Sequence, residues 1–242
     1  MAQYSTEAII LGVKNWGEAD KLLWFFSREQ GKIRAAAYGA RRARSLLAGV
    51  LQPFNKVQVT LSEGERIDTV RQCSVEIRYK KPAEDLTTMA YASFVAELAL
   101  ELTAEHEQQP EVYEELGKIF SAFEERNPRL VALAAAFRLF AAEGLSLNLD
   151  SCIHCGQKIT EDAFANVKEG GALCSACAEK DLPLSTGARE LIAKLKTINF
   201  AEPPAFSVKG ADMIAAERLM LAYLPEITEK PLKSLQFIGQ LN

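Results

Sequence analysis

Hydrophobic and polar residues alternate over much of the first 81 residues, and this pattern predicts β-strands. Residues 57–61 (VQVTL) alternate strictly, so one face of that strand is expected to be buried and the other wet. Four further apolar and β-branched runs, separated by turn-prone or charged segments, occupy residues 8–13, 22–26, 33–38 and 67–77. Five such strands, with a short helix-like insert at residues 45–51, fit a five-stranded OB barrel, although an SH3-like barrel would show a similar pattern.

After Pro82 the apolar residues take the spacing of amphipathic helices. The predicted helices cover residues 86–105, a segment that begins at Pro110, a segment that begins after Asn127, residues 187–195 and residues 211–224. Proline suits the first position of a helix, and asparagine is a good N-cap because its side chain accepts from the first free amides. Pro225 is expected to end the last of these helices.

Charge is distributed unevenly along the chain. The whole chain of 242 residues carries a net charge of −4, but residues 1–81 hold 14 Lys and Arg against 8 Asp and Glu. Residues 1–81 therefore carry a net charge of +6, and residues 82–242 carry a net charge of −10. This polarity predicts a basic module for an anionic partner, attached to an acidic body. The N-terminal residues lack the pattern of a signal peptide and no apolar run is long enough to span a membrane, so we expect a cytoplasmic protein.

Four of the five cysteines form two close pairs, Cys152 with Cys155 and Cys174 with Cys177. The spacing C-x2-C-x18-C-x2-C lets two tight turns present four thiolates to one ion, which is the closed arrangement of a structural zinc site. Gly156 would permit the sharp bend after the first pair. Iron in a rubredoxin-like site is the minor alternative.

The remaining candidates for chemistry are few. His154 lies between two ligands and is expected to face solvent, His106 is expected to be a solvated residue, and Cys73 lies in a strand as a packed side chain. Neither histidine has a plausible nucleophile beside it in the sequence, so we find no catalytic residues and predict that the protein is not an enzyme.

A basic segment follows the third predicted strand. Lys32 and Arg34 alternate with Ile33 and should project from one face, and a loop with three arginines follows. The predicted DNA-binding residues are Lys32, Arg34, Arg41, Arg42 and Arg44. Arginine binds phosphate oxygens through paired hydrogen bonds, and Trp16 and Tyr38 are candidates for stacking on unpaired bases.

At this point the sequence resembles the RecO family of bacterial DNA repair and recombination mediators. The matching stretches are residues 7–11 (EAIIL), 17–21 (GEADK), 26–32 (FSREQGK), 39–42 (GARR) with Ser45, and 51–54 (LQPF). The resemblance implies an α+β multidomain protein: an OB-fold domain over residues 1–81 and a helical domain over residues 82–242, interrupted by a four-cysteine zinc ribbon at about residues 150–180.

The same resemblance implies the partners. Such proteins bind single- and double-stranded DNA and anneal complementary strands. With RecR they help to load RecA onto DNA covered by single-strand-binding protein (SSB), and some members bind the C-terminal tail of SSB. Zn²⁺ at Cys152, Cys155, Cys174 and Cys177 is expected to be structural, and a bacterial, nucleoid-associated location follows.

Two other classes of function remain open from the residues themselves. A zinc-ribbon interaction or transcription-associated module would use its barrel to bind another protein and would not bind DNA directly. A cysteine-based redox or metal-carrier protein would form disulfides reversibly or transfer its metal.

Overall fold

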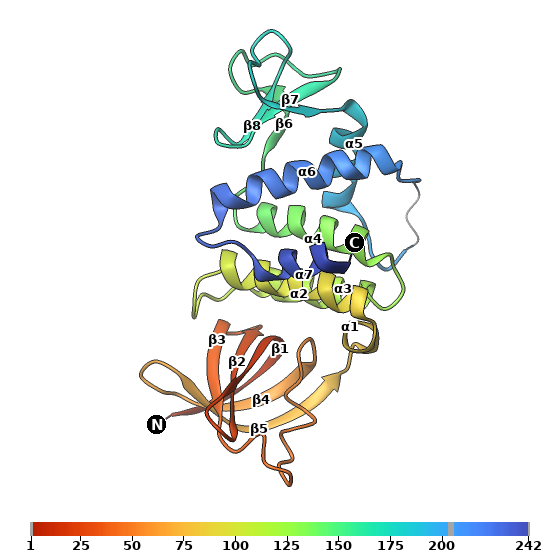
Figure 1. Ribbon diagram of the computed structural model, residues 1–242. Helices are drawn as coiled ribbons and strands as arrows, with labels where there is room; N and C mark the ends of the chain where they lie inside the picture. Colours follow the sequence, from red (N-terminus) through yellow and green to blue (C-terminus); the bar gives the residue numbers. More distant parts are fainter. Residues whose placement is uncertain (1, 203–205, 242) are drawn as a thin grey trace. The chain divides into compact units, whose positions relative to one another are not determined.

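The first five strands form a closed barrel in the computed structural model, which describes residues 2–202 and 206–241 (Figure 1). The strands are β1 (Gln3–Trp16), β2 (Asp20–Ser27), β3 (Gly31–Ala37), β4 (Lys56–Ser62) and β5 (Asp68–Ile77). They follow the order β1-β2-β3-β5-β4, and β4 pairs with β1 to close the barrel. Among the described strands of the barrel, β3 and β5 pair in parallel and the other neighbours are antiparallel. The prediction of a five-stranded OB barrel is confirmed.

Alternate residues of each strand fill the barrel. Val57, Val59 and Leu61 of β4 are fully buried, as their alternation with polar residues predicted. The insert at residues 45–51 is a series of turns, not the predicted helix-like segment. Its backbone bonds mix spans of three residues, such as Ala48 N to Ser45 O, with spans of four, and a glycine within it disfavours a regular helix.

Seven helices are present in the described part of the chain. They are α1 (Lys80–Glu84), α2 (Leu86–Leu102), α3 (Pro110–Ala122), α4 (Pro128–Ala142), α5 (Thr186–Thr197), α6 (Gly210–Ile227) and α7 (Lys233–Leu241). The predicted starts at Pro110 and after Asn127 are confirmed, and the Asn127 side chain accepts from the amides of Arg129 and Leu130. Within residues 2–202 and 206–241, no helix is long and apolar enough to cross a membrane.

The prediction that Pro225 ends its helix is wrong, because α6 continues to Ile227. A proline near the end of a helix removes only its own backbone donor, and the ladder resumes beyond it. The amide of Thr228 still donates to the carbonyl of Leu224 at 2.9 Å.

Four short strands lie between α4 and α5 and form a second sheet. They are β6 (Asn148–Cys152), β7 (Ala163–Asn166), β8 (Gly171–Leu173) and β9 (Leu182–Leu184), in the order β6-β8-β7-β9. This sheet carries all four cysteines of the predicted metal site on its strands and adjoining turns.

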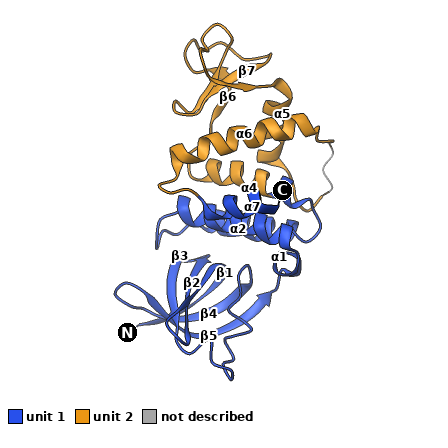
Figure 2. Ribbon diagram, viewed as in Figure 1, with its two compact units in different colours: residues 1–131, 232–242 blue, residues 132–231 orange. Residues whose placement is uncertain are grey.

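The chain divides into two compact units (Figure 2). Unit 1 contains residues 1–131 and 232–242, and unit 2 contains residues 132–231. The barrel, α1, α2, α3 and the C-terminal helix α7 therefore belong to unit 1, whereas the cysteine-bearing sheet, α5 and α6 belong to unit 2.

Candidate nucleic-acid surface and metal centre

The four paired cysteines converge in unit 2. The Sγ atoms of Cys152, Cys155, Cys174 and Cys177 all lie within 4.8 Å of one another, and those of Cys155 and Cys174 are 3.8 Å apart. In a tetrahedron with zinc–sulfur bonds of about 2.3 Å, the sulfur atoms are separated by about 3.8 Å. The number, type and spacing of the donors therefore fit one tetrahedral ion such as Zn²⁺.

Backbone turns present these thiols as the sequence predicted. Gly156 has φ 73°, and its amide donates to the carbonyl of Cys152 at 2.8 Å. In the second pair, the amide of Cys177 donates to the carbonyl of Cys174 at 3.0 Å. His154 lies outside the cluster, exposed, with Nε2 2.7 Å from a carboxylate oxygen of Glu169.

Backbone amides also favour the thiolate form of Cys152, one of the four cysteines of the candidate metal site. Hydrogen bonds from the amides of Cys155 and Cys174 lower the pKa of the Cys152 thiol to about 6. Because the thiolate is the species that binds metal, these amides prepare the site for a cation.

An arginine from α5 fastens the sheet to the helical part of unit 2. Nη1 of Arg189 donates to the carbonyls of Leu149 (3.2 Å) and Ile159 (3.0 Å), and Nη2 donates to that of Glu161 at 2.8 Å. No pattern in the sequence indicates this role, because the three acceptors are backbone atoms 28 to 40 residues away.

In unit 1, two exposed aromatic rings meet at one end of the barrel. Trp16 is the last residue of β1 and Tyr38 follows the last residue of β3. Their ring centroids are 6.1 Å apart, and the ring planes meet at 40°. The side chains are 42% and 60% exposed. The two candidate stacking residues therefore form one pair.

The loop after β3 is bonded to the turn between β1 and β2. Nη1 of Arg41 donates to the carbonyls of Gly17 (3.2 Å) and Glu18 (3.0 Å), and its backbone amide donates to the carbonyl of Ala19 at 2.8 Å. The amide of Gly39 donates to Asp20 Oδ1 at 2.7 Å. These bonds hold the two loops, and with them the two rings, together.

The five predicted DNA-binding residues take different positions. Arg42 and Arg44 are exposed, and neither guanidinium has a hydrogen-bond or ion-pair partner among residues 2–202 and 206–241. Arg34 is half-buried, with Nη2 3.4 Å from the carbonyl of Arg66 and Nε 3.9 Å from a carboxylate oxygen of Glu105. In that described part of the chain, Arg42 and Arg44 are thus the exposed cations of this set whose guanidinium groups are not engaged by the protein itself.

Lys32 projects from the same face of β3 as Arg34, as predicted, but towards the end of α2. Its Nζ donates to the carbonyl of Leu100 at 2.7 Å and also to that of Thr103. These carbonyls belong to the end of α2, which has no basic residue in its own last turn. The ammonium group therefore caps a helix.

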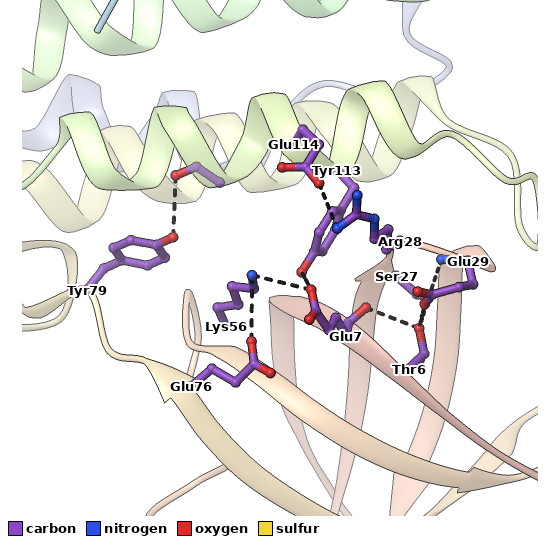
Figure 3. A network of polar contacts seen from close by, with 11 residues as sticks. Thr6, Glu7, Ser27, Arg28, Glu29, Lys56, Glu76, Tyr79, Tyr113 and Glu114 are labelled. Atoms are coloured by element: carbon purple, nitrogen blue, oxygen red, sulfur yellow. Dashed lines mark hydrogen bonds and ion pairs between the residues drawn. The ribbon is translucent and has the colours of Figure 1, made fainter. Parts of the chain in front are cut away.

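Polar contacts also join the barrel to α3, in addition to the contact of Lys32 with α2, as Figure 3 shows. Lys56 Nζ lies 3.4 Å from Glu7 Oε2, and the hydroxyl of Tyr113 donates to the same oxygen at 3.3 Å. Burial and the Glu7 carboxylate raise the pKa of Tyr113. Arg28 forms an ion pair with Glu114 at 3.1 Å. Arg28 and Lys56 of the barrel thus form ion pairs with carboxylates, whereas none is found for Arg42 and Arg44 in the described part of the chain.

Comparison with known proteins gives a consistent result over the whole chain. The family model described as "Recombination protein O N terminal" matches residues 1–78, and "Recombination protein O C terminal" matches residues 83–236. The chain is 32% identical to the DNA repair protein RecO of Symbiobacterium thermophilum, over 100% of this chain and 98% of the relative. It is 30% identical to the DNA repair protein RecO of Pelotomaculum thermopropionicum, over 99% and 95% of the two chains.

Proposed function

Because this chain belongs to the RecO family of DNA repair proteins, we propose that it serves recombinational repair by binding DNA at the end of its barrel that carries Trp16, Tyr38, Arg42 and Arg44. The observation that carries the proposal is the accessibility of this group. Two guanidinium groups that have no partner in the described part of the chain lie in the loop that follows Tyr38, within the basic residues 1–81.

The proposed binding step is electrostatic. Arg42 and Arg44 contact backbone phosphates, and Arg34 extends the positive surface along β3. Neutralising phosphates reduces the repulsion between two strands, and contacts confined to the backbone leave base edges free to pair. This is the chemistry that strand annealing requires, and it involves no covalent step, so we assign no catalytic residue.

We further propose the partners of the family for this chain. It would act with RecR to load RecA onto single-stranded DNA covered by SSB, would contact the tail of SSB, and would work in the bacterial cytoplasm at the nucleoid. Zn²⁺ at the four cysteines would stabilise unit 2 without taking part in DNA binding, since a four-thiolate site leaves no open coordination position.

The test is annealing of two complementary labelled oligonucleotides, bare and coated with SSB, over a series of salt concentrations. We expect acceleration that falls steeply with salt. The double variant Arg42→Ala, Arg44→Ala should lower the slope of log affinity against log salt by about 1.4 for a single strand, since each phosphate contact contributes about 0.7.

A matched control removes two cations elsewhere. Lys118→Ala with Arg218→Ala changes the net charge equally, on α3 and α6, and should leave the slope unchanged. An equal loss in both double variants would show that net charge, and not this surface, governs binding. A protein that binds no DNA at low salt would instead support the interaction module of the zinc-ribbon class.

A further inference from the structure

Trp16 and Tyr38 stand next to one another because of strand register. Trp16 is paired with Asp20 across the β1–β2 ladder, and Lys21 is paired with Ala37 across the β2–β3 ladder. Tyr38, one residue beyond Ala37, therefore comes beside Asp20 and close to Trp16. Both rings lie at the end of the barrel where their strands stop.

The pair is held by the loops more than by contact between the rings. Their planes are tilted by 40°, so the rings do not stack face to face. The bonds from Arg41 to Gly17 and Glu18 fix the two loops instead. Since 42% of Trp16 and 60% of Tyr38 remain exposed, the fixed arrangement leaves ring surface open to a ligand.

The distance and angle between the two rings determine whether the bases of a duplex or those of an unpaired strand can stack on them. Successive bases in a duplex rise by about 3.4 Å and are stacked on one another. Rings 6.1 Å apart and tilted by 40° cannot both receive bases that keep this stacking. They can receive bases of a strand that is unpaired and extended.

We infer that Trp16 and Tyr38 form a platform for unpaired bases, aligned by Arg41, and that this platform gives the surface its preference for single-stranded over duplex DNA. The inference rests on the proposed function, because it concerns the same surface. Stacking accepts any base, so the platform adds affinity without sequence specificity. Arg41 is a positioning residue here, whereas Arg42 and Arg44 contact phosphates.

The experiment compares binding of a labelled oligothymidylate and of a hairpin duplex of the same phosphate number at fixed salt. Removal of one stacking ring costs about 5- to 150-fold in affinity per base. We expect Trp16→Ala and Tyr38→Ala to weaken binding of the single strand on the order of tenfold each and to change duplex binding less than twofold. Leu46→Ala, which removes a 92% exposed side chain from the loop after β3, should retain wild-type affinity. Tyr38→Phe, which keeps the ring, should weaken single-strand binding less than Tyr38→Ala does.

Tryptophan fluorescence reads the contact directly. Trp16 and Trp24 are the only tryptophans, so in a Trp24→Phe background the emission reports on Trp16 alone. Oligothymidylate should quench this emission, and the hairpin should not. Arg41→Ala should reduce the quenching and the single-strand preference while leaving the salt slope unchanged, whereas Arg42→Ala should lower the slope and leave the preference intact.

Equal losses for the single strand and the duplex on removal of either ring would overturn the platform, as would an unquenched Trp16. In both cases the salt-dependent loss in the Arg42→Ala, Arg44→Ala variant would still stand and keep the proposed function. Absence of any DNA binding by the wild-type protein would overturn both.

Discussion

Lys32 offers a sharp test of how the barrel and α2 are joined. Replacing it by methionine keeps an unbranched side chain as far as the ε carbon and removes the ammonium group that donates to the carbonyls of Leu100 and Thr103. The end of α2 then loses a cationic cap that the helix does not supply itself, since it has no basic residue in its own last turn.

The magnitude follows from the two bonds. A hydrogen bond to a charged group contributes about 1.5 to 3 kcal/mol, and two bonds from one donor are not fully additive, so Lys32→Met should cost about 2 to 4 kcal/mol. For a chain of this size that corresponds to a fall in melting temperature of roughly 5 to 15 °C. Circular dichroism during heating, with urea unfolding at 25 °C, measures the loss.

The control is Lys118→Met on α3. Lys118 is 64% exposed, and its contact with Glu115 at 4.0 Å is a surface pair worth about 0.3 to 0.5 kcal/mol at most. Below the melting transition, Lys32→Met should keep the wild-type salt slope for DNA. An unchanged melting temperature combined with a slope reduced by about 0.7 would refute the reasoning, because it would place Lys32 on a phosphate.

Three further predictions concern the other stabilising features. Chelation of the metal should release about one Zn²⁺ per chain, detected with a colorimetric indicator, and should lower the melting temperature; an identical melting curve with and without chelator would contradict a structural ion. Arg189→Ala should destabilise unit 2 by about 2 to 4 kcal/mol in urea, because three hydrogen bonds to backbone carbonyls are lost, two of them part-buried, whereas Glu190→Ala next to it should have little effect. The hydroxyl and then the amide of Thr88 lower the pKa of Asp85 at the start of α2, so the stability from this cap is present at neutral pH and is lost as the pH falls through the lowered pKa. Urea midpoints from pH 5 to pH 2 should therefore show a smaller acid-dependent loss in Asp85→Asn than in wild type, and parallel curves would exclude the effect.

Local patterns were sufficient for the five barrel strands, for five of the helices and for the convergence of the four cysteines. They did not indicate the short helix α1, the C-terminal helix α7 or the four strands of the second sheet. Strict alternation located β4, and the caps at Pro110 and Asn127 located the starts of two helices. The four cysteines converge as their spacing predicted, since two tight turns need only local geometry to present two thiols each.

Contacts between distant segments could not be predicted in this way. The acceptors of Lys32 lie 68 and 71 residues further along the chain, and both are backbone carbonyls that carry no mark in the sequence. The contact of Lys56 with Glu7 likewise depends on which strands become neighbours in the barrel. The sequence therefore cannot distinguish a basic residue that binds phosphate from one, such as Lys32, whose side chain bonds to an acceptor within the protein.

The division of unit 1 between the two ends of the chain affects the order of events during synthesis. Helix α7 belongs to this unit, and the amides of Lys233 and Ser234 at its start donate to the carboxylate of Glu97 on α2. Residues 132–231 must leave the ribosome before α7 does, which takes roughly 5 to 20 s at about 5 to 20 residues per second. During that interval the barrel strands and α2 have already been synthesised, but the surface of α2 that α7 will cover is still exposed. The yield of folded protein therefore depends on how well this surface is protected from association with other chains.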